Sequence, residues 1–245
     1  MPIVRAARLG SRARSLTLLA ASIAAGLAVG GCAGSRMSTE PAAGVSLAGP
    51  WKLDHAASDD PQKLLATMRA QAIKIISRHQ AAMAAAPPPM RGGRPDQDYI
   101  PPEEDPLFAP GPDGRRPDPL KRSPMAQIIM QTAARGDFLA VRQSPDELMF
   151  DYGTSRRSFT PGAHSVVSTE TGVGDQISGW KSGEYVIEIK GQLGPNVTES
   201  YGLSPDKHEL IDKLHISAGE LPAVSLTRIY RSTTDIAPQQ LPSTD

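Results

Sequence analysis

Carboxylates and an imidazole gather in residues 54–60. Asp54-His55 and Asp59-Asp60 place three carboxylates and one histidine within these seven residues. Oxygen ligands of this kind suit a hard cation such as Ca²⁺ or Mg²⁺. The alternative is a solvated turn between a strand and a helix, in which the Asp60 side chain caps the helix. The turn accounts for every residue of the stretch, so we expect neither a metal nor a cofactor there.

Patterns that carry enzymatic chemistry are missing from the sequence. The five histidines form neither a His-Glu-x-x-His motif nor a cluster with cysteine, which excludes the usual zinc arrangements. Ser178-Gly179 lacks one flanking glycine of a hydrolase nucleophile elbow. Glu103-Glu104-Asp105 lies among prolines, where carboxylates are solvated and poorly positioned for acid–base work. No catalytic residue is predicted, and a hydrolase with an unrecognised active site stays the alternative function.

The only cysteine, Cys32, follows a segment that is typical of secretion. A weakly apolar run of 14 residues, 16–29, comes after a basic region with no acidic residue and four arginines: Arg5, Arg8, Arg12 and Arg14. The run is shorter than the roughly 20 apolar residues of a membrane-spanning helix. It therefore indicates a signal peptide over residues 1–31 rather than a permanent transmembrane helix.

Val29-Gly30-Gly31-Cys32 resembles the lipobox of bacterial lipoproteins. In that class the cysteine sulfur carries a diacylglyceryl group and becomes the first residue of the mature chain. The resemblance implies lipidation at Cys32 and attachment to a lipid bilayer through several acyl chains. Ala33 stands where an Asp commonly retains such proteins at the inner membrane, which implies the outer membrane, facing the periplasm. An ordinary secretory signal with a chance cysteine is the alternative.

Removal of the signal peptide changes the charge of the chain. The full sequence holds 26 basic and 26 acidic side chains, and loss of the four arginines leaves 22 basic against 26 acidic, a net charge of about −4. A mildly acidic chain has no general attraction for nucleic acid. With Cys32 acylated, no thiol remains for a disulfide or a soft metal site. The expected partners are the bilayer and either an envelope protein or an apolar small ligand.

A tether and a long helix are predicted at the start of the mature chain. Residues 32–46 contain too few bulky apolar side chains to order themselves by burial, and we expect a flexible tether. Asp60-Pro61 is a typical helix start, and apolar residues recur at spacings of three and four from Leu65 to Met83. This pattern predicts a helix over residues 61–85 whose apolar stripe packs on the protein's own sheet. A helix on a membrane surface is the alternative, because its polar side is basic.

Proline interrupts the chain between residues 87 and 124, where 12 of the 38 residues are proline. Such a segment cannot form a core element, and we expect an insertion loop or linker. The alternative is a recognition arm for a partner, anchored by its bulky apolar residues: Tyr99, Ile100, Leu107 and Phe108. Ser123-Pro124 then starts a second, short helix that ends at Gly136.

From Phe138 onward, apolar and polar residues alternate with a period of two. Apolar or β-branched runs recur about every ten residues between turn signals. Leu210, Leu214 and Ile216 share one face of such a run, and Ile187 and Ile189 share one face of another. We predict a mainly β (α+β) domain over residues 47–235, before a disordered tail at 236–245. Its antiparallel meander of about 8–10 short strands forms a barrel or strongly curved sheet, with both helices packed on it.

Three segments carry a second resemblance. Gly179-Trp180, Glu188-Ile189-Lys190 and residues 198–206 together resemble lipocalin-like meanders of bacterial envelope proteins, over about the last 95 residues. The resemblance implies a fold and no active residues. We therefore expect a membrane-anchored, non-enzymatic binding or assembly module. Either the curved sheet takes an apolar ligand or the Pro-rich arm takes a protein.

Overall fold

The computed structural model describes four stretches of the chain: residues 37–85, 117–169, 172–219 and 221–234. The sites that the sequence predicts for lipidation and partner binding lie outside these stretches: Cys32, Tyr99, Ile100, Leu107 and Phe108. The chain divides into two units, residues 1–34 and 35–245, and every described residue belongs to the second. In the described part, no helix combines the length and the apolar character needed to cross a membrane.

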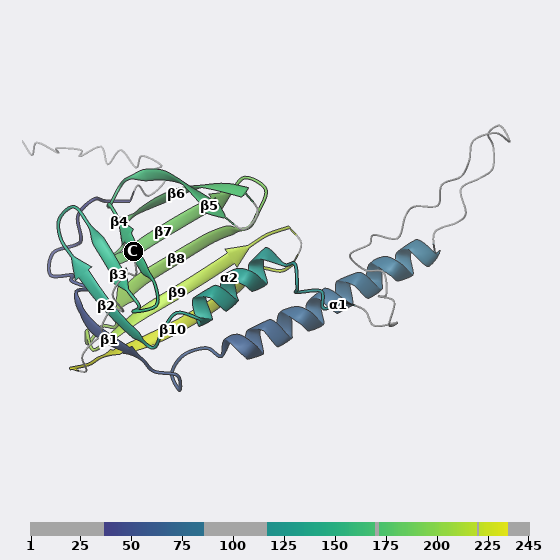
Figure 1. The fold of residues 1–245 in the computed structure, drawn as a ribbon, viewed down its shortest axis with the longest axis horizontal. Coiled ribbons are helices and arrows are strands. Elements are labelled where there is room, and N and C mark those ends of the chain that lie inside the picture. The colour runs from purple at the N-terminus through teal and green to yellow at the C-terminus, as the bar shows by residue number, and fades with distance from the viewer. Residues whose placement is uncertain (1–36, 86–116, 170–171, 220, 235–245) are drawn as a thin grey trace, which may run out of the picture. The chain divides into compact units, whose positions relative to one another are not determined.

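Ten strands form one antiparallel sheet (Figure 1). They are β1 (Gly49–Leu53), β2 (Phe138–Gln143), β3 (Leu148–Asp151), β4 (Arg156–Phe159), β5 (His164–Thr169), β6 (Gly172–Lys181), β7 (Glu184–Gly191), β8 (Asn196–Leu203), β9 (Glu209–Ser217) and β10 (Val224–Ser232). Their order is β4-β3-β2-β1-β10-β9-β8-β7-β6-β5, so β1 joins the two ends of the meander. The sheet curls into a half-barrel, which confirms the predicted antiparallel, strongly curved architecture.

The alternation of apolar and polar residues sets which side chains face the concave side. On β7, Tyr185 and Ile187 are buried there, whereas Lys190 is exposed on the other face. Aromatic rings fill the concave side between β3 and β8: Phe150 stacks on Tyr201 with ring centroids 4.1 Å apart. Burial of such rings stabilises the curl, because each removes a large apolar area from water.

The second helix, α2 (Pro124–Ala133), covers the other end of the concave side. The Ser123 side chain accepts a hydrogen bond from the Ala126 N–H, as its predicted cap position requires. The buried face of α2 packs with apolar side chains of β9 and β10 in a second core: Met125, Ala126, Ile129, Leu214, Ile216 and Leu226. The helix ends at Ala133, before the predicted stop at Gly136, and this leaves Arg135 in the connection to β2.

The long helix α1 (Pro61–Ala85) is covered only along its first half. The Asp60 carboxylate caps it by accepting a hydrogen bond of 2.8 Å from the Gln62 N–H. Leu65, Met68 and Ala72 are buried in the core that α2 shares with the sheet. Beyond Ala72 no residue of α1 is buried, so the predicted packing of the apolar stripe holds for its first half only.

The sequence predicts no packed structure for the segments 32–46 and 87–124. The described part of each segment nevertheless contacts the domain. In the segment 32–46, Ser38 pairs with Trp180 of β6 through hydrogen bonds of 2.7 and 2.8 Å. β5 covers the edge of β6 only as far as Ile177, so Ser38 satisfies backbone groups that β5 leaves free. Gly179 permits this approach, since a Cβ there would lie 2.8 Å from the Ser38 carbonyl oxygen. In the segment 87–124, Leu120 is buried beside α1.

Candidate ligand-binding cleft

The carboxylates of residues 54–60 are occupied by structural hydrogen bonds. Asp54 accepts from Arg231 Nε at 2.7 Å, and Asp59 accepts from the Thr227 N–H at 2.7 Å. Asp60 caps α1. Within the described stretches, no three metal-ligating side chains come together. The residues therefore form the strand-to-helix turn that was the alternative to a cation site.

Two histidines make contacts that could suggest chemistry, and both lie in solvent. His55 Nε2 is 3.1 Å from Asp137 Oδ1, with both side chains more than half exposed. His215 Nδ1 is 3.0 Å from Ser225 Oγ on an exposed face of β9 and β10. Neither pair lies in a recess that would hold a substrate away from water.

Charged side chains instead meet on the concave face of the sheet. Alternation points Glu199 of β8, Asp212 of β9 and Arg228 of β10 inward, and all three are buried. Arg157 of β4 and Arg135, just after α2, reach the same place from the other side. Three buried tyrosines complete this group, which we call the ionic cluster: Tyr152, Tyr201 and Tyr230.

Glu199 is the best-satisfied member of the ionic cluster. Arg135 Nη1 donates to Glu199 Oε1, and Arg157 Nη1 donates to Oε2 at 2.5 Å. Tyr201 Oη donates to Oε1 at 2.9 Å and lies 2.7 Å from Tyr152 Oη. Burial alone would raise the pKa of Glu199, but the two guanidinium groups outweigh it and hold the pKa well below its ordinary value. Glu199 is therefore ionised at neutral pH.

Asp212, unlike Glu199, lies in an environment where no described residue offers its carboxylate a hydrogen-bond donor. Neither of its buried carboxylate oxygens has a hydrogen-bond partner among the described residues, and its cationic neighbour Arg135 is 3.9 Å away. Burial, reinforced by the charge of Glu199, raises the pKa of Asp212 to about 7. Three guanidinium groups thus face one full and one partial carboxylate charge. The ionic cluster carries a net positive charge at neutral pH.

Two further polar groups of β10 are unsatisfied. Arg228 Nη2 donates to the carbonyl oxygens of Arg135 and Gly136, at 3.3 and 3.4 Å. Arg228 Nη1 and Tyr230 Oη are buried and find no partner among the described residues. A buried polar group without a partner costs about 1–3 kcal/mol. The interior therefore has unused hydrogen-bonding capacity of the kind that a water molecule or a polar ligand group would satisfy.

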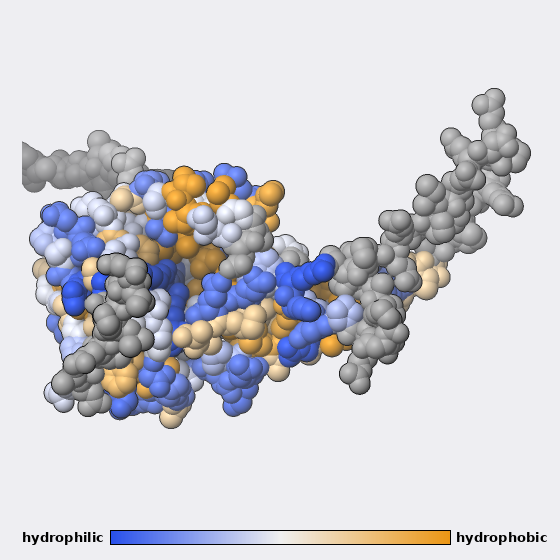
Figure 2. All heavy atoms as spheres, viewed as in Figure 1, coloured by the Kyte–Doolittle hydropathy of each residue, from blue (hydrophilic) through white to orange (hydrophobic). Residues whose placement is uncertain are grey.

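The ionic cluster adjoins an apolar recess on the concave side. Figure 2 shows this recess, with an apolar floor, between the β5–β6 hairpin and α2. Inward-facing, half-buried apolar side chains come from β5, β7, β8 and α2: Val167, Ile189, Val197 and Ile128. Val197 is one inward position from Glu199 on β8. We call these four residues, together with Arg135 and Arg157, the cleft; the two arginines are 15% and 23% exposed.

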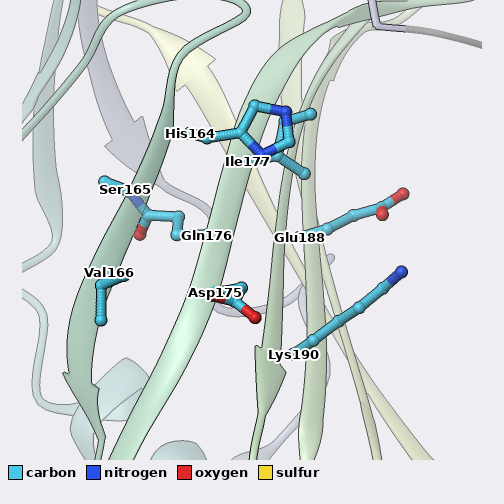
Figure 3. Close-up of a pocket in the computed structure, with 8 residues that line it drawn as sticks. All are labelled: His164, Ser165, Val166, Asp175, Gln176, Ile177, Glu188 and Lys190. Atoms are coloured by element: carbon cyan, nitrogen blue, oxygen red, sulfur yellow. The ribbon is translucent and has the colours of Figure 1, made fainter.

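A second hollow, of about 430 Å³, lies on the outer face of β5, β6 and β7 (Figure 3). Its ionisable side chains, which Figure 3 shows spread over the three strands, are His164, Asp175, Glu188 and Lys190. His164, Asp175 and Lys190 are exposed, whereas Glu199, Asp212 and Arg228 of the ionic cluster are buried. We do not regard this hollow as the functional site.

Sequence reasoning missed the ionic cluster, although part of the signal was present. The alternation that placed Leu210 and Leu214 on a core face also places Asp212 there, between them. A charged residue in the phase of a core face is the feature that should have been noted. Arg135 and Arg157 carry no such signal, because only the curl of the sheet brings them to Glu199.

Comparisons with known proteins identify no family for this chain. No family model matches the sequence, and no curated protein matches it. Similar solved structures include apo lipid binding protein 8 of Caenorhabditis elegans, with TM-score 0.40, 11% identity and coverage of 78% of this chain and 100% of that one. The fatty acid transporter REP1-NXSQ gives TM-score 0.37 and 14% identity, covering 78% of this chain and 97% of that one.

A fatty acid-binding protein from brain tissue of Drosophila melanogaster gives TM-score 0.33 and 19% identity, covering 43% of this chain and 80% of that one. With TM-scores below 0.5 and identities below 25%, these similarities assign neither a family nor a ligand to this chain.

Proposed function

We propose that this protein is a non-enzymatic binding module that takes an amphipathic ligand with an acidic head group into the cleft. One observation carries the proposal: a half-buried apolar wall ends at a buried ionic cluster with an excess of positive charge. An apolar recess with a few convergent polar groups is the usual form of a small-molecule site.

The apolar part of the ligand would lie on Ile189, Val197 and Val167. These side chains face the concave side, and α2 covers the sheet mainly at β9 and β10. Each methylene of a ligand that is buried there contributes about 0.8 kcal/mol. An alkyl chain of ordinary lipid length could therefore bind with useful affinity without a strong polar contact.

The head group would bind at Arg157 and Arg135. Each guanidinium group has five N–H donors in a fork that matches a carboxylate or phosphate, and Glu199 uses only some of them. Because the cluster has more cationic than anionic charge, an added anion is attracted. In its protonated form, Asp212 is neutral and does not repel the acidic head group.

We further propose that acylated Cys32 holds the protein at the outer membrane, facing the periplasm. The lipobox-like sequence supports this anchor. Replacement of Cys32 by Ser should move the chain from the membrane fraction to the soluble fraction and abolish acyl labelling. Unchanged labelling and membrane association would contradict it.

The ligand proposal is tested by titrating the full chain with palmitate and with hexadecanol, which share a chain length and differ in head group. We expect one palmitate per chain and at least about tenfold weaker binding of the alcohol, the equivalent of about 1.4 kcal/mol. Arg157→Gln should remove most of this preference. Arg156→Gln is the matched control, since the neighbouring Arg156 is exposed and pairs with Asp151. Equal affinity for both compounds, or no binding of either, would contradict the proposal.

A further inference from the structure

The apolar stripe of α1 continues beyond the part that the domain covers. Leu65, Met68 and Ala72 are buried, and the same helix face continues through Ile76 to Met83. Ile75 and Met83 are 41% and 55% exposed. Figure 1 shows α1 running on past α2. The second half of α1 therefore presents an apolar face that no described residue buries.

This helix is also strongly basic. Between Pro61 and Ala85 it contains four basic and no acidic residues: Lys63, Arg69, Lys74 and Arg78. Lys74 and Arg78 flank the uncovered half of the stripe, so a segment that pairs with it should combine acidic and bulky apolar residues. The stripe has no aromatic residue and is rich in alanine, which argues against a membrane surface as its cover.

The chain makes such a contact where it returns to the domain. Asp118 accepts hydrogen bonds from Arg69 Nε and Nη2, at 3.0 and 2.8 Å. Two residues later, Leu120 is buried in the same core as Met68 and Ala72. An acidic and an apolar residue of the returning chain thus already lie on α1, at the point where its covered half ends.

We propose that residues 95–113 of the same chain extend this contact along the uncovered half of α1. These residues hold six acidic and no basic side chains, together with all four apolar residues that the sequence identified as anchors: Tyr99, Ile100, Leu107 and Phe108. The acidic groups face Lys74 and Arg78, and the apolar groups cover the stripe from Ile75 to Met83.

The length of the connection permits this contact. From Arg69 to Ala85 the helix rises about 24 Å, at 1.5 Å per residue, and residues 86–116 must return over that distance. Fully extended, about seven residues would suffice at 3.3–3.6 Å each. The remaining residues are free to follow the helix surface. The anchors then serve the chain itself, and a protein partner would have to compete for them.

Hydrogen–deuterium exchange of the full chain without ligand tests the contact independently of the cleft. We expect slow exchange at residues 73–85 and at least about tenfold faster exchange there in the Leu107→Ser/Phe108→Ser double variant. Leu193→Ser is the matched control, because Leu193 is 89% exposed in the β7–β8 turn. Unchanged protection of β8 and β9 shows that the double variant is folded. Equal exchange of residues 73–85 in the wild type and the double variant would overturn the proposal.

A designed disulfide identifies the occupant. In a Cys32→Ser chain, Met83→Cys with Leu107→Cys should form a bond within one chain, in a yield that does not depend on protein concentration. A bond that forms only between chains would overturn the proposal in favour of a second copy. Protection of residues 73–85 that appears only when vesicles of anionic phospholipid are added would overturn it in favour of a membrane surface.

Discussion

Replacement of Asp212 by asparagine should stabilise the protein at alkaline pH. The pKa of this buried carboxyl is raised from 3.8 to about 7, first by burial and then by the charge of Glu199. The folded state therefore holds a proton that the unfolded state has lost, and stability falls as the pH rises between these two values. At about 1.4 kcal/mol per pH unit, the loss by pH 7 amounts to roughly 4 kcal/mol as an upper estimate.

The asparagine side chain is a neutral amide of nearly the same shape as the carboxyl, so the variant avoids this cost. Urea unfolding at pH 5, 6.5 and 8 should show Asp212→Asn more stable than the wild type by about 1.6 kcal/mol at pH 5 and by about 4 kcal/mol at pH 8, at about 1.4 kcal/mol per pH unit up to pH 7. Glu199 does not obscure this window, because its lowered pKa gives stability that is present above about pH 4.5 and is lost only at lower pH.

Asp175→Asn is the control for this comparison, since Asp175 is exposed on β6. It should leave the dependence of stability on pH unchanged. If Asp212→Asn destabilises the protein at pH 8, or if its stability runs parallel to that of the wild type from pH 5 to 8, Asp212 is not a desolvated carboxyl. The three guanidinium groups of the ionic cluster would then face two ionised carboxylates, and the excess of positive charge would be smaller.

Three further predictions concern the core and the cleft. In urea melts, Ile187→Ala should lower the free energy of unfolding by about 2–5 kcal/mol, because Ile187 is fully buried on the concave face. Glu188→Ala should change it by no more than about 0.5 kcal/mol. Equal losses in the two variants would contradict the assignment of Ile187 to the inner face and Glu188 to the outer face. Leu120→Ala should also cost at least about 2 kcal/mol, and a negligible cost would mean that the end of the Pro-rich segment does not pack. Palmitate affinity should fall about tenfold between pH 6 and 8 as Asp212 ionises, an effect of about 1.4 kcal/mol, and a fall of equal size in Asp212→Asn would exclude Asp212 as its cause.

The strands of the sheet could be predicted from the sequence, because turn residues and the alternation of apolar and polar residues are visible within short segments. Turn residues such as Ser182-Gly183 fix where strands end, and Ser182 and Gly183 indeed both adopt positive φ. The shared face of Ile187 and Ile189 followed from a period of two, and the structure confirms it, since both side chains pack in the core. Helix starts at Pro61 and Pro124 followed in the same way from capping residues.

The candidate site was less predictable because it depends on curvature. Arg157 and Glu199 are 42 residues apart, and only the curl of the sheet brings β4 over β8. The contact of the segment 32–46 with the sheet was not predicted either. Ser38 is held by hydrogen bonds between its backbone and that of Trp180, and the type of its side chain gives no sign of them. Such contacts depend on which edge groups remain unpaired, and that is decided by the whole sheet.

The central feature of the proposed function is an acidic head group that lies among the arginines of the ionic cluster. Palmitate labelled with ¹³C at its carboxyl carbon tests this most directly, by NMR titration on the full chain. We predict that the bound carboxyl stays ionised to a pH well below that at which the free acid protonates, because Arg157 and Arg135 favour its charged form. The resonance should return to ordinary titration in Arg157→Gln but not in Arg156→Gln. A bound carboxyl that titrates as it does in water, or that is indifferent to Arg157, would contradict the account.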